Sequence, residues 1–280
     1  MDGDGNGAPA TDPMTEGLEP ESGADLLPAE PEKTMDRDRV RRYGRIAAGV
    51  LVAWVLIVGI LAGIGKLIMI THNGNGDLLG DRTIPRWFLA HRTPSLNHLS
   101  LVVSNLGATQ DILIASVVTC VVFLAVTRRW RPVFFIAVVM FGELAAFLIV
   151  EEIVKRPRPA VPHLDSGLPT SAFPSGHMAA TTCLYAAIAI LVIGHARGWW
   201  RYLFLIPAVV MPAAIATARM YRGEHHPTDI LASVLFAALW LTAATRLIEP
   251  NRDAFRRGAR PGLARRKAAG HSQETVQSMS

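Results

Sequence analysis

The sequence predicts an all-α, polytopic membrane protein in which six transmembrane helices form a bundle after a disordered N-terminal tail. Half of the 280 residues are hydrophobic and only 18% are charged. The charges gather at the two ends and in short connections, and six apolar stretches have about the 18 residues needed to cross roughly 30 Å of hydrocarbon. The net charge of +5 comes from basic residues beside these stretches. That position indicates a role in membrane orientation and no binding of nucleic acid.

The N-terminal segment has the composition of a disordered tail. Residues 1–32 hold nine acidic residues, no Lys or Arg, and many Gly, Pro, Ala and Ser, so they cannot bury enough apolar surface to fold. The segment lacks the basic start and early apolar core of a signal peptide, and the first crossing is expected to remain as an anchor. We therefore divide the chain into an acidic, then basic tail (1–44), a membrane domain (45–248) and a basic tail (249–280).

The crossings follow from the apolar stretches taken in order. They are expected at residues 46–64, 110–127, 132–154, 177–194, 202–218 and 229–245. Pro132 suits the first position of a helix. Residues 66–97 mix apolar and polar side chains too irregularly to span and are expected along the outer surface. Within this region, residues 87–106 fit an interfacial amphipathic helix and an anchored loop equally well.

The distribution of basic residues predicts the orientation. With six crossings, 19 of the 28 Lys and Arg residues fall on the side that carries both termini. Cytoplasmic segments are enriched in Lys and Arg, so both termini are expected in the cytoplasm of a multi-pass cell-membrane protein. The polar residues near positions 158, 177 and 219–229 then meet at the outer face.

The fourth crossing opens with Pro174-Ser175-Gly176-His177. At a helix N-terminus, free backbone N–H groups and the helix dipole attract an anion, and the missing side chain of Gly176 lets a phosphate approach. The alternative for this tetrapeptide is an ordinary helix start, capped by the side chain of Ser175, with His177 exposed by chance.

A second polar stretch runs from Arg219 to Asp229. A carboxylate four residues after His225 can accept its ring N–H, which fixes the tautomer and leaves the other nitrogen free to attack phosphorus. Two histidines with arginines around the phosphoryl oxygens can carry covalent phosphoryl transfer without a metal. The alternative for this stretch is a solvated polar loop.

Together these stretches resemble the type 2 phosphatidic acid phosphatase superfamily, which includes membrane lipid phosphatases and is related to vanadium haloperoxidases. The family pattern has three parts: Lys, six residues and Arg-Pro; Pro-Ser-Gly-His; and Ser-Arg, five residues, His, three residues and Asp. The chain matches it at Arg158-Pro159, at Pro174 to His177, and at Arg219, His225 and Asp229. The resemblance covers about residues 45–248.

The resemblance implies a role for each matching residue. His225 is the implied nucleophile that forms a phosphohistidine, Asp229 orients it, and His177 protonates the leaving oxygen. The implied phosphate-binding groups are Arg158, Arg219, Ser175 and the backbone of Gly176. No metal and no other cofactor is expected.

Two positions depart from the family pattern: Glu151 replaces the Lys and Ala218 replaces the Ser. A carboxylate at position 151 would repel phosphate unless it is protonated or paired. Lys155, one helical turn later on the same face, is expected to supply the positive charge at the phosphate site. Glu151 is therefore the strongest argument for altered substrate choice or weakened catalysis.

The leading functional hypothesis is an integral membrane phosphatase whose substrate is a lipid phosphate or diphosphate in the outer leaflet. Polyprenyl diphosphate, phosphatidic acid and phosphatidylglycerophosphate all fit. One alternative is a phosphotransferase or sugar-phosphate phosphatase with the same intermediate, because a fold does not choose the acceptor. Another is a lipid-binding protein that kept the pocket and lost turnover, which Glu151 favours.

The remaining polar residues carry weaker expectations. An unpaired charge at Glu143, inside the third crossing, would cost at least about 2.5–3.5 kcal/mol, so this residue is expected to face the bundle, protonated or hydrogen-bonded. Function and structure explain it equally well. His226 lacks the motif spacing and is expected beside the site. Surface positions are expected for His72, His91, His98 and His163, and Cys120 and Cys183 are expected to pack as small apolar residues.

Overall fold

The computed structural model describes residues 31–71, 78–165 and 171–252, and all its regular elements are helices. The chain divides into two compact units, Met1–Tyr43 and Gly44–Ser280. The first helix, α1 (Pro31–Thr71), crosses this boundary. Of the tail predicted at residues 1–44, residues 1–30 lie outside the described part, and residues from Pro31 onward are helical. Residues 33–44, the basic part of that predicted tail, therefore belong to α1.

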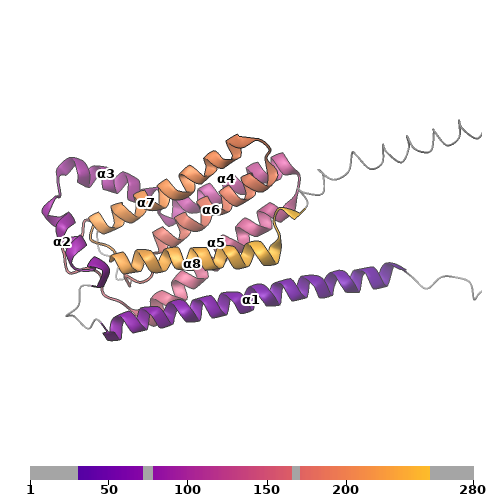
Figure 1. The fold of residues 1–280 in the computed structure, drawn as a ribbon, viewed down its shortest axis with the longest axis horizontal. Coiled ribbons are helices and arrows are strands. Elements are labelled where there is room, and N and C mark those ends of the chain that lie inside the picture. Colours follow the sequence, from indigo (N-terminus) through magenta and orange to yellow (C-terminus); the bar gives the residue numbers. More distant parts are fainter. Residues whose placement is uncertain (1–30, 72–77, 166–170, 253–280) are drawn as a thin grey trace, which may run out of the picture. The chain divides into compact units, whose positions relative to one another are not determined.

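The described helices include six that are long and apolar enough to cross a membrane, which confirms the predicted class (Figure 1). The first is α1; the second and third are α4 (Thr109–Thr127) and α5 (Trp130–Val154). The fourth is α6 (Gly176–His195). The fifth joins a 3-10 turn, η2 (Trp199–Phe204), to α7 (Leu205–Tyr221), and the sixth is α8 (Pro227–Ile248).

The described part of the region between the first two crossings, residues 78–108, consists mainly of helices. A short turn, η1 (Leu78–Gly80), leads to α2 (Thr83–Ala90) and α3 (Pro94–Asn105). Thr93 separates α2 from α3 because its side chain accepts the N–H of Leu96 at 3.3 Å and caps α3. The single helix considered for residues 87–106 is thus two, and α3 packs against α7.

The core of the Gly44–Ser280 unit lies where α6 packs against α4, α5, α7 and α8. Its largest fully buried side chain is Trp240, whose indole N–H donates to the carbonyl oxygen of Val139 at 3.0 Å. A Cβ atom on Gly142 would lie 2.4 Å from this indole ring, so a glycine permits the close approach of α5 and α8. The carbonyl of Gly142 also accepts the indole N–H of Trp54 at 2.7 Å, which ties α1 to α5.

Candidate active site

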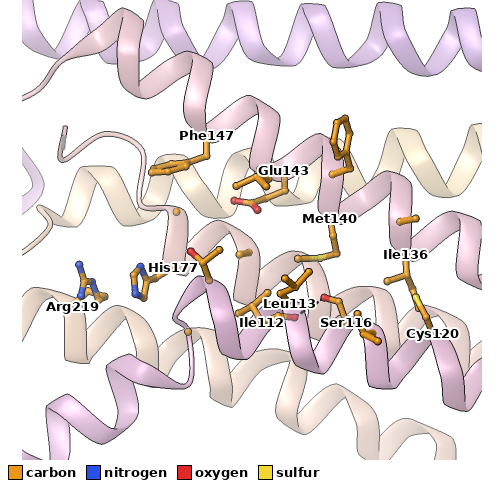
Figure 2. A pocket seen from close by; sticks show the side chains of 18 of the residues that line it. Ile112, Leu113, Ser116, Cys120, Ile136, Met140, Glu143, Phe147, His177 and Arg219 are labelled. Atoms are coloured by element: carbon orange, nitrogen blue, oxygen red, sulfur yellow. Dashed lines mark hydrogen bonds between the residues drawn. The ribbon is translucent and has the colours of Figure 1, made fainter. Parts of the chain in front are cut away.

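One groove collects residues from all three sequence motifs. It encloses about 560 Å³ among α4, α5 and α6, and its polar end is lined by Arg158, His177, Arg219 and His225 together with Ser171 and Gly176. The remaining lining is mostly apolar. Figure 2 shows Arg219 and His177 at one end of this groove and Ile136 and Cys120 towards the other. Residues that are up to 67 positions apart in the sequence therefore face a common space, as the six-crossing topology predicts.

His225 is buried and held by a backbone carbonyl. Its Nδ1 lies 2.8 Å from the carbonyl oxygen of Ala172. Because a carbonyl oxygen can only accept, the proton resides on Nδ1 and the lone pair on Nε2. Burial lowers the pKa of His225 well below its usual range, and the positive charge of Arg219 lowers it further. The imidazole is thus neutral and has the tautomer that a nucleophile on Nε2 requires.

Asp229 has different partners from those that the sequence predicts. Its Oδ2 accepts the backbone N–H of His226 at 2.7 Å and lies 3.0 Å from Nδ1 of the same residue. Its Oδ1 forms a salt bridge with Arg156. The expectation that Asp229 accepts the ring N–H of His225 is therefore wrong, because Ala172 occupies that position. Asp229 holds the N-terminus of α8, where it completes a capping box with His226.

Arg156 connects Asp229 to a second buried carboxylate. One of its Nη atoms lies 2.6 Å from Asp81 Oδ2, and the other lies 2.7 Å from the hydroxyl of Thr228. Thr228 in turn donates its backbone N–H to Asp81 at 3.0 Å. The backbone of Arg156 also accepts the N–H of Ala172 at 2.8 Å. One arginine therefore joins the segment before α2, the start of α8 and the carbonyl that holds His225.

The start of α6 contributes Gly176 and His177 to the lining of the groove. Ser175 is fully buried, and its side chain makes no capping bond and has no hydrogen-bond partner among the described residues. The alternative in which Ser175 caps the helix is thus not what the structure shows. Its backbone N–H donates to the hydroxyl oxygen of Ser233 at 2.9 Å. Gly176 packs so closely on Phe147 that a Cβ atom would lie 3.0 Å from the ring.

The two motif arginines are paired with carboxylates. Arg158 forms a salt bridge with Glu224, a residue with only 3% of its side chain exposed. Arg219 lies 2.7 Å from Asp165 and donates to the hydroxyl of Ser104 at 3.1 Å. These contacts orient both guanidinium groups beside the histidines.

Asp165 is also held by a buried arginine outside the motifs, Arg222. The Nε of Arg222 donates to Asp165 at 2.6 Å, and another of its nitrogens donates to Ser100 of α3 at 3.2 Å. Burial alone would raise the pKa of Asp165, but the hydrogen bond from Arg222 and the charge of Arg219 hold this pKa below its usual range. Asp165 therefore stays ionised and links the two arginines.

Lys155 does not take the role expected of it. Its side chain is 67% exposed and lies 2.6 Å from Glu152, at the end of α5. Residue 155 has a left-handed backbone, with φ of 53°, and closes the helix. The same-face argument fails because the helix ends there. Glu151 accepts the backbone N–H of Ser171 at 3.0 Å, so this carboxylate is paired and braces the segment that carries Ala172.

The remaining polar residues named in the sequence analysis lie as follows. Glu143 is buried, as expected, and lines the groove. His226 lies beside Asp229, as expected, and faces a separate cavity of about 410 Å³ beyond Arg156. His91, His98 and His163 are exposed, while His72 lies outside the described residues. Cys120 and Cys183 are free thiols, and Cys183 is buried.

Sequence reasoning missed the residues that position the motif side chains. They are Asp81, Arg156, Asp165, Arg222 and Glu224. All belong to charged stretches next to a motif or, for Asp81 and Asp165, to the connections between crossings. A usable signal was the excess of Arg near the motifs: Arg156 and Arg222 had no role in the predicted site, although buried arginines need carboxylate partners.

Known proteins resemble this chain in sequence and in fold. The model of the PAP2 superfamily matches residues 132–253. Phosphatidylglycerophosphatase B of Bacillus subtilis is 27% identical over 154 residues, which cover 54% of this chain and 74% of that protein. A crystal structure of a transmembrane PAP2-type phosphatidylglycerolphosphate phosphatase, also from Bacillus subtilis, is similar with a TM-score of 0.60 and 23% identity, over 71% of this chain and 95% of that one. The resemblance seen in the three motifs is confirmed: residues 132–253 of this multi-pass membrane protein match the PAP2 superfamily.

Proposed function

We propose that the chain is an integral membrane phosphatase that hydrolyses a lipid phosphate or diphosphate through a phosphohistidine on His225. The observation that carries this proposal is the groove, which has His177, His225, Arg158 and Arg219 at one end and continues as a mostly apolar space among helices that can span a membrane. Such a space suits a substrate with a phosphate at one end and a hydrocarbon chain at the other. Phosphatidylglycerophosphatase B, the relative described above, is named for a lipid phosphate of this kind.

In the first half of the reaction, Nε2 of His225 attacks phosphorus, and the bond from phosphorus to the leaving oxygen breaks. His177 gives its proton to that oxygen, and Arg158 and Arg219 stabilise the charge on the phosphoryl oxygens. In the second half, His177 takes a proton from water, whose oxygen attacks phosphorus. The phosphorus–nitrogen bond breaks, and inorganic phosphate and neutral His225 are restored. The Nδ1–H of His225 stays on the Ala172 carbonyl throughout.

Pairing of Glu151 supports turnover rather than simple lipid binding. A free carboxylate at this position would oppose phosphate, but here it accepts the N–H of Ser171 and helps to hold the segment that orients His225. The positive charge that the family Lys would supply has no replacement at Lys155. We therefore assign charge stabilisation to the two motif arginines and to the N-terminus of α6.

The first test is phosphate release by the purified protein from phosphatidic acid, phosphatidylglycerophosphate, a polyprenyl diphosphate and a sugar phosphate. We expect release from lipid substrates, unchanged by EDTA and inhibited by vanadate, because arginines supply the charge that a metal would otherwise provide. Release that EDTA abolishes and magnesium restores would refute metal independence. Release from the sugar phosphate alone would refute a lipid substrate.

The second test traps the acid-labile phosphoenzyme from an aryl phosphate by rapid quench. We expect none in His225→Ala, whereas His177→Ala should still form it, because a good leaving group needs little of the roughly 10²- to 10⁴-fold help from a general acid. The control is His98→Ala, at an exposed position on α3, which should behave as wild type. Phosphoenzyme in His225→Ala and none in His177→Ala would reverse the two roles.

A further inference from the structure

Glu143 is a buried acid whose oxygens face the groove. Its residue exposure is 3%, and it lines the same groove as the two histidines. Figure 2 shows its carboxylate turned towards the space that His177 and Ser116 also border. No side chain or backbone group of the described residues is hydrogen-bonded to it. The hydroxyl hydrogen of the polar neighbour Ser116 is not directed at Glu143, because it is donated to the carbonyl oxygen of Ile112 at 2.7 Å.

A carboxyl group without a partner in hydrocarbon is costly, whether ionised or neutral. Its surroundings are otherwise apolar: Met140 and Leu144 flank it on α5 and Leu113 faces it from α4. Leu113 and Leu144 are also exposed on the outside of the protein, so the groove borders the lipid phase between α4 and α5. A ligand that enters from the bilayer and offers a hydrogen bond at this depth would relieve the cost.

Glu143 lies at the level of the groove between the proposed phosphate site and the part that fits a hydrocarbon chain. Phe147 packs against Gly176, at the start of α6. Glu143 lies one turn further along α5, about 6 Å from the level of Phe147. Ile136 lines the groove about 10 Å beyond Glu143, and the wall between them is apolar. The carboxyl group therefore sits directly below the phosphoryl site and above the part of the groove that fits hydrocarbon.

We propose that Glu143 binds the hydrogen-bonding group that follows the phosphate in a glycerolipid phosphate, an ester carbonyl or an oxygen that links a chain to glycerol, and so favours such lipids over polyprenyl phosphates. This inference rests on the proposed lipid phosphatase function. In a diacylglycerol phosphate, ester oxygens follow the phosphate within a few bonds and precede the chains. A polyprenyl phosphate has only hydrocarbon there and would leave Glu143 without a partner at a cost comparable to a lost hydrogen bond.

The test compares kcat/KM for a diacyl phosphatidic acid, its di-O-alkyl ether analogue and a polyprenyl monophosphate. The variants are Glu143→Met, which keeps length and removes hydrogen bonding, and Glu143→Gln, which keeps hydrogen bonding. For Glu143→Met we expect kcat/KM on the diacyl lipid to fall about tenfold, or about 1.4 kcal/mol, with no loss on the polyprenyl lipid. Glu143→Gln should retain most of the diacyl activity. The control is Thr119→Ala, which removes a hydroxyl bonded within α4 at a position outside the groove lining.

Each outcome decides the matter. Wild-type preference for the polyprenyl lipid, or an equal loss on all three lipids in Glu143→Met, would overturn the role of Glu143 while leaving a lipid phosphatase. Phosphate release from an aryl phosphate but from no lipid would overturn the proposed function itself. A diacyl-to-polyprenyl ratio that falls in Glu143→Met, with Thr119→Ala unchanged, supports the inference. A diacyl-to-ether ratio that falls as well assigns the contact to an ester carbonyl; an unchanged one assigns it to the chain-linking oxygens of glycerol, which both lipids carry.

Discussion

Replacement of Asp229 by Asn is expected to weaken the fold more than the chemistry. The side chain of Asp229 is fully buried and forms a salt bridge with Arg156, whose side chain is 8% exposed. Loss of one member of a buried ion pair costs about 3–5 kcal/mol because the other charge stays in the interior. Here Arg156 keeps Asp81 at 2.6 Å, so we expect the lower end of this range. At about 2–4 °C per kcal/mol, that corresponds to a fall in Tm of roughly 6–12 °C.

The assay is thermal unfolding in detergent for Asp229→Asn, Asp81→Asn and the double variant. The double variant should lose more stability than the sum of the single variants, because Arg156 then has neither carboxylate. The control is Glu249→Gln, which breaks an ion pair with Arg252 in which the Glu249 side chain is 52% exposed. Such a pair contributes little, about 0–1 kcal/mol.

The same samples separate stability from catalysis. The proton on Nδ1 of His225 is fixed by the carbonyl of Ala172, so folded Asp229→Asn should still form the phosphoenzyme at a rate near that of wild type. An unchanged Tm together with a loss of about 10⁴-fold in the rate, the size seen when a triad carboxylate is replaced, would show that Asp229 orients the nucleophile after all.

Three further predictions follow from buried groups and from the topology. Because burial lowers the pKa of His225, the unfolded chain binds a proton that the folded chain does not. The free energy of unfolding should therefore be largest above about pH 6.5 and fall below it, by up to about 1.4 kcal/mol per pH unit. Denaturant titrations at several pH values should show a weaker dependence of this free energy on pH in His225→Asn than in wild type, and an equal dependence would contradict the prediction. Gly142→Ala should cost about 1–3 kcal/mol because its Cβ would meet Trp240, whereas Gly63→Ala, with nothing within 4 Å, should leave Tm nearly unchanged; equal Tm values would argue against close packing of α5 on α8. In a cysteine-free background, His163→Cys should react with an impermeant maleimide in intact cells and Arg197→Cys only after permeabilisation; the opposite pattern would invert the topology.

The six spans were predictable because hydrocarbon imposes a length and a composition on any helix that crosses it. The predicted starts of the third and sixth crossings are within two residues of the helices observed, at Trp130 and Pro227. Polar sequences carry no such constraint. The division between α2 and α3 depends on one capping hydroxyl, that of Thr93, and on tertiary contacts. A periodicity argument over residues 87–106 could not find it.

Convergence of the motif residues in one groove was predictable, because their side of the membrane followed from counting crossings. The partners of those residues were not. Asp229 has the spacing to reach His225 along the chain, but spacing does not reveal that Ala172, from another segment, comes closer. Lys155 lies on the expected face only if α5 continues, and the helix ends at Val154. Both errors came from assuming that regular helix spacing continues where the chain leaves a helix or turns into one.

The contacts between α3 and α7 bear on how substrate preference can change among relatives. Three residues at the end of α7 donate hydrogen bonds to α3. Arg219 donates to Ser104, Arg222 donates to Ser100, and the hydroxyl of Tyr221 donates to Asn97 at 2.8 Å. The segment of residues 78–105 is thus hydrogen-bonded to Arg219, one of the two arginines proposed to bind phosphate. An exchange of residues 78–105 alone would leave donors of α7 without acceptors. We therefore expect relatives that differ in residues 78–105 to differ also in the last two turns of α7. A change of headgroup preference would then need substitutions in both segments.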